Sequence, residues 1–434
     1  MASSIADVFY QGAKIGAVFW DADRRFSVFE YTPDFIRSGF ELAPLKMPLR
    51  PGPYQFPNLH ESFFGLPGLL ADCLPDTYGN TLIDAWLRQQ GRSPADFTPV
   101  ERLFYIGNRG MGALEFQPGL RDNASKSERV EIDKLVELAS LALSQKDGLS
   151  TDFDGEDGLR EILRVGTSAG GARAKAVIAL NPTTQEVRSG QAEAPEGFEH
   201  WLLKFDGVSE SFDGVRDPQG YGRIEYAYYL MAQKAAINMS ECRIFEDGGR
   251  AHFMTRRFDR LDEGGKVHIA SLYGIAHMPY SAPGTHSHSY EDYFEIIEDL
   301  GLEPRFKLEA FRRMAFNILG CNRDDHSKNF GFILGDSGKW ELAPAFDITY
   351  AHNPAPGKWT AAQQMSIGGK RESINRDDLL ALGRRCNVAT LPKLKNAVDQ
   401  VVASLESWQD CANKAKVSHK QIQKIDTVIR MGLD

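Results

Sequence analysis

The 434-residue sequence has little cysteine, and the few cysteines do not group. An odd number of scattered cysteines, with no CxxC pair, argues against a disulfide framework and against a structural zinc site. We therefore expect a reducing environment, as in the cytoplasm. The cysteines are Cys73, Cys242, Cys321, Cys386 and Cys411.

Long apolar runs and an excess of positive charge are missing as well. No window approaches the roughly 18 apolar residues that indicate a membrane-spanning helix. The first residues lack a basic stretch followed by an apolar one, so we expect no signal peptide, no membrane association and a cytoplasmic protein. The formal net charge is −9, so the totals do not indicate a strongly basic nucleic-acid surface.

What is present is an ordinary globular composition, with 42% hydrophobic and 25% charged residues. Single cores stop growing at about 250–300 residues, so the length predicts two or three domains. Early runs such as "KIGAVFWD" and "RFSVFEY", separated by turn residues, predict β-strands. The polar, turn-rich "QPGLRDNASKSE" predicts a boundary near residue 120.

Strands and helices mix beyond that boundary. "AKAVIALN" and "EHWLLKFDG" predict strands, and the spacing of apolar residues predicts a helix over 221–238. "ECRIFEDGGRAHFMTRRFDR" predicts a hairpin that turns at Gly248–Gly249, with Arg256 and Arg260 facing outward. From about residue 290 the pattern is mainly helical, and the last fifty residues predict two amphipathic helices.

The most informative stretch is "LGCNRDDHSKNFGF", where polar residues lie between two apolar segments. Asp324 and Asn329 have the D-x-x-x-x-N spacing of a protein-kinase catalytic loop, in which Asp accepts the proton of the attacking hydroxyl and Asn binds magnesium. Asp325 is a second, lesser candidate for the base. Asp347 follows in "APAFDI", and its carboxylate is a second hard oxygen ligand of the kind that magnesium prefers.

Two upstream segments complete a phosphate-binding pattern. Gly166, Gly170 and Gly171 of "VGTSAGGARAK" would let backbone N–H groups close around phosphate. Lys204 ends an apolar strand, where it could pair with ATP phosphates, and Glu225 on the next helix could pair with Lys204. Each of these residues has an ordinary alternative. Lys204 could be a solvated lysine, Glu225 a surface charge on its helix, and Asp347 a helix N-cap.

Taken in this order, the motifs resemble those of the HipA family, bacterial serine/threonine kinases that act as toxins in toxin–antitoxin modules. The matching segments run in family order from about residue 60 to 350. They are "GLLADCLPDTYGN", "IGNRGMGALEF", "GTSAGGARAKA", "HWLLKF", "RRFDR", "NRDDHSKNFGF" and "LAPAFDI".

The resemblance implies a role for each matching residue. Asp324 is then the catalytic base, Lys204 the catalytic lysine that contacts phosphate, and Asn329 and Asp347 the magnesium ligands. The implied nucleotide-binding residues are Ser168, Ala169, Gly170, Gly171, Ala172 and Arg173 of the phosphate loop, Lys175 and Lys204, Thr255, Arg256, Arg257 and Phe258 beside adenine, and His326, Lys328, Asn329 and Asp347.

Ser168 matches a family serine whose phosphorylation ejects the loop and switches the kinase off; phosphoserine adds about −1.5 to −2 charges where ATP phosphates would bind. His326 could bind phosphate or brace the loop, and we favour bracing. In a departure from the family pattern, Ala174 precedes Lys175 where the family commonly has proline.

The resemblance also implies an α+β, protein-kinase-like fold. The expected parts are a β-rich N-terminal subdomain (1–120), an N-lobe-like region (121–258) and a helical C-lobe (259–434). ATP and magnesium are the implied cofactors. The implied partners are a protein substrate such as an aminoacyl-tRNA synthetase and a small DNA-binding, HipB-like antitoxin, with DNA bound only through or with it. A small-molecule phosphotransferase and a non-catalytic co-repressor module remain alternatives.

Overall fold

The computed structural model describes most of the chain. The described residues are 4–119, 127–144, 162, 165–166, 173–191, 194–208, 220–280, 288–355 and 358–433. They form two compact units that are not contiguous in sequence. The first unit contains residues 1–219 and 243–269, and the second contains 220–242 and 270–434.

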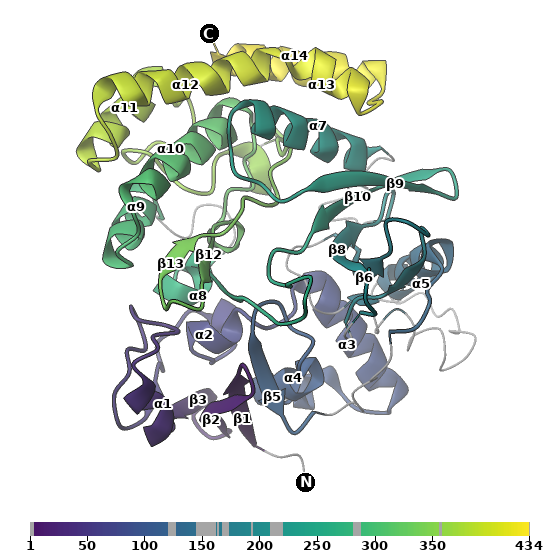
Figure 1. The fold of residues 1–434 in the computed structure, drawn as a ribbon, viewed down its shortest axis with the longest axis vertical. Coiled ribbons are helices and arrows are strands. Elements are labelled where there is room, and N and C mark those ends of the chain that lie inside the picture. Colours follow the sequence, from purple (N-terminus) through teal and green to yellow (C-terminus); the bar gives the residue numbers. More distant parts are fainter. Residues whose placement is uncertain are drawn as a thin grey trace. The chain divides into compact units, whose positions relative to one another are not determined.

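The first unit begins with an antiparallel five-stranded sheet in the order β4-β3-β2-β1-β5 (Figure 1). Gln11 and Gly12 both have positive φ, of 46° and 77°, as a tight hairpin turn requires. The early strands are therefore confirmed. The strands are β1 Ile5–Tyr10, β2 Ala13–Asp21, β3 Phe26–Tyr31, β4 Tyr54–Gln55 and β5 Leu114–Gln117.

The helices of this unit start at side chains that satisfy their first N–H groups. Asp76 accepts the N–H of Gly79, and Thr98 and Glu101 form a reciprocal capping box. The helices are α1 Pro33–Ser38, α2 Gly68–Ala71, α3 Thr77–Gln89, α4 Pro99–Ile106 and α5 Ile132–Ser144.

A second sheet, in the order β7-β6-β8-β10-β9, carries the predicted strand lysine. Its residues Ile178, Trp201 and Leu203 pack in one core with Leu82 of α3 and Leu135 of α5. The hairpin turns at Gly248–Gly249, as predicted. The strands are β6 Lys175–Leu180, β7 Val187–Ser189, β8 Glu199–Lys204, β9 Cys242–Asp247 and β10 Arg250–Arg256.

The second unit is mainly helical, as predicted, with one short sheet in the order β11-β12-β13. Figure 1 shows α10 beneath the C-terminal helices, and α10 packs against α12. The strands are β11 His268–Ser271, β12 Gly331–Leu334 and β13 Trp340–Leu342. The helices are α7 Tyr221–Lys234, α8 Leu272–Ala276, α9 Tyr290–Asp299, α10 Pro304–Leu319, α11 Arg376–Arg385, α12 Leu391–Glu406, α13 Trp408–Lys414 and α14 His419–Leu433.

The prediction of two C-terminal helices is wrong, because this segment forms three. The hydroxyl of Ser407 donates to the carbonyl of Ser404 at 2.7 Å and interrupts the pattern between α12 and α13. The buried indole N–H of Trp408 donates to the carbonyl of Ile422 at 3.0 Å and ties α13 to α14. The apolar period is the same across the break, so periodicity alone did not reveal it.

Candidate functional site

The polar stretch predicted as a catalytic loop connects α10 to β12. Cys321 has a positive φ of 56°, and the next N–H, that of Asn322, donates back to the carbonyl of Asn317 at 2.8 Å. A short 3-10 turn, Ser327–Asn329, then leads into β12. Both ends of the loop are therefore fixed by regular elements of the second unit.

Asp324 and Asn329 close this loop on itself. The amide nitrogen of Asn329 donates to the backbone carbonyl of Asp324 at 2.7 Å. This bond explains the four-residue spacing, because it joins the residue that opens the turn to the residue that ends it. Since the nitrogen is used internally, the Oδ1 atom of Asn329 is the one left to bind a cation.

Asp347 reaches the same place from β13. Asn322, Asp325, Asn329 and Asp347 are among the residues that line one cavity of about 20 Å³, room for about one water molecule. The φ of Asp347 is +53°, a conformation that residues other than glycine adopt rarely and aspartate tolerates better than most. Such strain costs on the order of 1–3 kcal/mol and is concentrated at functional sites.

The donor set of this cavity fits magnesium. The carboxylate of Asp347 and the amide oxygen of Asn329 are hard ligands, and the buried Oδ1 of Asn322 has no hydrogen-bond partner among the described residues. In the described part of the chain, no three His, Cys, Asp or Glu side chains gather as in an all-protein metal site. Magnesium needs no such cage, because phosphate and water supply its remaining ligands.

The two adjacent aspartates occupy opposite environments. The side chain of Asp324 is 41% exposed, whereas Asp325 is buried and accepts hydrogen bonds from the hydroxyl of Tyr290 at 2.8 Å and the N–H of Gln364 at 2.6 Å. Burial raises the pKa of Asp325 to about 7. Exposure therefore favours Asp324 as the proton acceptor and gives Asp325 an internal, structural position.

His326 and Lys328 face an aromatic group beside the loop. The Nδ1 atom of His326 accepts the N–H of Lys328 at 3.3 Å, and its Nε2 lies 3.7 Å from Oδ1 of Asp324. The ammonium of Lys328 lies over the rings of Tyr273 and Tyr280, at 4.6 and 5.0 Å from their centroids. This arrangement supports the bracing role for His326.

One side chain at this site was missed from the sequence. The indole N–H of Trp359 donates to Oδ1 of Asp324. The two residues are 35 positions apart, and no spacing or motif around Trp359 marks it.

In the first unit, Lys204 and Lys175 lie opposite each other on β8 and β6. The ammonium of Lys204 is 5.6 Å from the ring centroid of Phe253. That of Lys175 is buried against Asp76 at 2.7 Å, with 2% and 6% of the two side chains exposed. Lys175 thus ties the start of β6 to the N-terminus of α3. Glu225, the predicted partner of Lys204, belongs to the second unit, where it is buried on α7.

The glycine-rich segment is described only in part. Ser168, Ala169, Gly170, Gly171 and Ala172 lie outside the described residues. A Cβ atom at Gly166 would lie 2.8 Å from Cδ1 of Leu82. Glycine at this position therefore has a packing reason, since it lets the chain approach α3.

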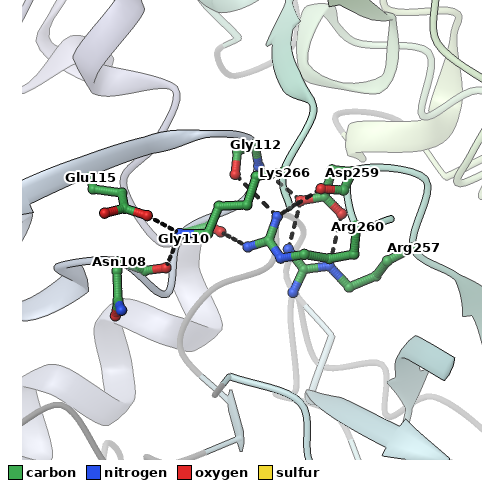
Figure 2. Close-up of polar contacts among 8 residues, drawn as sticks. All are labelled: Asn108, Gly110, Gly112, Glu115, Arg257, Asp259, Arg260 and Lys266. Atoms are coloured by element: carbon green, nitrogen blue, oxygen red, sulfur yellow. Dashed lines mark hydrogen bonds and ion pairs between the residues drawn. The ribbon is translucent and has the colours of Figure 1, made fainter. Parts of the chain in front are cut away.

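The predicted hinge, Thr255 to Phe258, leads into the buried polar network of Figure 2. Asp259 is fully buried and accepts hydrogen bonds from Arg257, from Arg260 and from the N–H of Gly112. Burial alone would raise the pKa of Asp259, but the two guanidinium groups outweigh it and hold this pKa well below its usual range. The predicted hinge is therefore followed by a buried segment whose charges compensate each other.

Arg260 corrects one prediction. It does not face outward: its side chain is 10% exposed and donates to the carbonyls of Gly110 at 2.8 Å and Gly112 at 3.1 Å. The strand ends at Arg256, so the alternation of a strand no longer applies four residues later. Lys266 adds a bond to the carbonyl of Asn108 at 2.6 Å and an ion pair with Glu115 (Figure 2).

The mixed helices and antiparallel sheets define an α+β protein of kinase-like fold, as predicted. Residues 6–117 match the HipA N-terminal domain, and residues 167–409 match the HipA-like C-terminal domain. The chain therefore belongs to the HipA family. None of the helices in the described parts has the length and apolar character that a membrane crossing requires.

Two solved structures are similar to this chain to different extents. The HipA of Shewanella oneidensis MR-1, solved in a toxin–antitoxin complex with HipB and operator DNA, is 17% identical, with a TM-score of 0.69 over 98% of this chain and 95% of that one. The Helicobacter pylori proinflammatory kinase CtkA is 12% identical, with a TM-score of 0.32 over 54% of this chain and 91% of that one. No match was found among curated protein sequences.

Proposed function

We propose that this protein is an ATP- and magnesium-dependent serine/threonine kinase that phosphorylates a protein of the translation machinery, such as an aminoacyl-tRNA synthetase, and so arrests growth. The observation that carries the proposal is that Asn329 and Asp347 line one cavity of the second unit, while Asn329 is hydrogen-bonded to the backbone carbonyl of Asp324. The HipA-like C-terminal domain, which contains all three residues, supports it.

The chemistry assigned to these residues follows from their exposure and donor atoms. The carboxylate of Asp324, which solvent can reach, accepts the proton of the substrate hydroxyl as its oxygen attacks the γ-phosphorus. Asn329 and Asp347 hold magnesium, which neutralises phosphate charge. Lys204 contacts the phosphates, and Arg173, Thr255 to Phe258 and Lys328 complete the nucleotide-binding set. His326 braces the loop, and Lys175, whose ammonium is buried against Asp76, ties β6 to α3 instead. Breaking the bond between the γ-phosphorus and the bridging oxygen leaves ADP.

Regulation and partners belong to the same proposal. Autophosphorylation of Ser168 would switch the kinase off, because the added charge repels the ATP phosphates. The Shewanella structure contains HipB and operator DNA. By analogy, we propose that this chain binds a small DNA-binding antitoxin and reaches DNA only through or with it.

Labelled ATP provides the test. The purified wild type with magnesium should label itself at Ser168 and label one or two proteins in a cell lysate, because a toxin kinase has few targets. Asp324→Ala should remove both signals, since no other exposed carboxylate of the loop can take the proton. Mass spectrometry of phosphopeptides gives the positions.

Asp377→Asn is the matched control, because Asp377 is an exposed aspartate in the first turn of α11, outside the site. Its labelling should equal that of the wild type. Label that persists in Asp324→Ala rejects the base assignment. Transfer to small molecules alone would favour the phosphotransferase alternative.

A further inference from the structure

The segment that contains Trp359 runs alongside the catalytic loop and contacts three consecutive loop residues. The guanidinium of Arg323 donates to the carbonyl of Ala361. The indole N–H of Trp359 donates to Oδ1 of Asp324, and the N–H of Gln364 donates to Oδ1 of Asp325. Residues 359–364 thus form a wall along the loop, within the second unit.

This wall is itself held in place. The side-chain amide of Gln364 donates to the carbonyls of Trp359 and Arg323. The guanidinium of Arg371 donates to the carbonyl of Gln364, and the N–H of Gln363 donates to the carbonyl of Arg371. Trp359 itself begins a 3-10 turn. The indole N–H is therefore presented from an ordered backbone.

The contacts divide the carboxylate of Asp324 into a braced oxygen and an open one. Oδ1 accepts the indole N–H and lies 3.7 Å from Nε2 of His326. The rings of His326 and Trp359 meet edge to face, with centroids 6.1 Å apart. Among the described residues no hydrogen bond reaches Oδ2, and the side chain is 41% exposed.

We infer that Trp359 is a positioning residue for the phosphotransfer step. Its indole N–H holds Oδ1 of Asp324 and thereby presents Oδ2 to the hydroxyl of the phosphoacceptor. His326 packs against the indole and limits its rotation. This inference rests on the proposed function and extends it to a residue that the family motifs do not mark.

Orientation of this kind acts on the chemical step. The proton leaves the hydroxyl for Oδ2 while the hydroxyl oxygen bonds to the γ-phosphorus and ADP departs. A carboxylate free to rotate would spend less time in the reactive geometry, and small misplacements of reacting groups are costly. The affinity for nucleotide should not change. Trp359 donates to Asp324, the proposed proton acceptor, and no hydrogen bond or ring contact among the described residues joins it to Asn329 or Asp347, the proposed magnesium ligands.

The variant Trp359→Phe keeps an aromatic ring and removes only the N–H donor. We expect its kcat to fall about tenfold or more, as for loss of a hydrogen bond to a charged group, with the KM for ATP unchanged. Trp408→Phe is the matched control, because it removes a buried indole N–H bond to the carbonyl of Ile422 in the same unit. It should lower stability and leave kcat unchanged.

The indole ¹H–¹⁵N resonances give a second measurement that needs no activity. The signal of Trp359 is identified by its loss in Trp359→Phe. In Asp324→Ala this signal should move, whereas that of Trp408 should stay. An unmoved Trp359 signal means that the contact with Asp324 is absent, and the inference fails.

The kinetic outcomes separate this inference from the proposed function. If the wild type transfers phosphate and Asp324→Ala does not, an unchanged kcat in Trp359→Phe overturns the positioning role alone. An increased kcat also overturns it and shows that the indole blocks the base. If the wild type transfers no phosphate, the proposed function fails and the positioning role falls with it.

Discussion

Asp325 shows how burial changes the chemistry of one residue in a pair of identical neighbours. It lies inside the second unit with its carboxyl group hydrogen-bonded to Tyr290 and Gln364, and burial raises its pKa to about 7. The same side chain one position earlier is partly solvated. Over a range of pH, Asp325 is therefore protonated in the folded protein and ionised in the unfolded chain.

This difference predicts a pH-dependent stability. From about pH 4 to about pH 7 the folded protein holds a proton on Asp325 that the unfolded chain has lost, so the free energy of unfolding falls as pH rises, by at most about 1.4 kcal/mol per pH unit. Above pH 7 the contribution levels off. Asp325→Asn lacks the titrating group and should show a shallower decline.

Urea denaturation of both proteins at pH 5, 6, 7 and 8 measures this. The difference between the two curves isolates Asp325, because all other titrating groups are common to both. Parallel curves would mean that Asp325 is ionised in the folded protein throughout this range.

At the scale of elements, the buried pair of Asp76 and Lys175 joins α3 to β6. Asp76 also accepts the N–H of Gly79 as the N-cap of α3. Each charge is buried and is compensated by the other. Loss of one partner would leave an uncompensated charge in the core of the first unit.

Lys175→Met should therefore lower the free energy of unfolding by about 3–5 kcal/mol, the cost of breaking a buried ion pair. The double variant Asp76→Asn/Lys175→Met should be more stable than the single one, because asparagine keeps the cap without the charge. Denaturant unfolding of the wild type, both single variants and the double variant gives the coupling energy. A double variant less stable than Lys175→Met would contradict the pairing.

Features that depend on residues close together in the sequence could be predicted, whereas features created by contacts between distant residues could not. The β1–β2 turn follows from Gln11 and Gly12, and the closure of the predicted catalytic loop follows from the spacing of Asp324 and Asn329. Trp359 could not be predicted, because its contact with Asp324 is created by tertiary folding. The inward position of Arg260 was missed because its acceptors are backbone carbonyls about 150 positions away in the chain, and backbone groups leave no pattern in a sequence.

At the scale of the whole molecule, the chain passes between its two units three times, at residues 219–220, 242–243 and 269–270. The proposed phosphate lysine, Lys204, belongs to the first unit, and Asp324, Asn329 and Asp347 belong to the second. The residues proposed to bind Mg-ATP therefore come from both units.

Binding predicts a measurable stabilisation. Mg-ATP at a hundred times its dissociation constant should add about 2.7 kcal/mol to the free energy of unfolding. At the same ligand concentration, Asp347→Ala should gain much less, because it lacks a magnesium ligand, and Asp377→Asn should gain as much as the wild type. Thermal denaturation with and without ligand tests this. A wild type that Mg-ATP does not stabilise would favour the non-catalytic module.

The network around Asp259 joins the two matched domains of this family member through specific hydrogen bonds, so the two domains have to change together. Arg260 and Lys266 take their acceptors from Asn108, Gly110, Gly112 and Glu115, which lie in the N-terminal match. A substitute N-terminal domain would have to place carbonyl oxygens at the same points. Otherwise the buried guanidinium of Arg260 would lose these hydrogen-bond acceptors. Swapping such domains between relatives is thus restricted by backbone geometry, which no comparison of side chains would reveal.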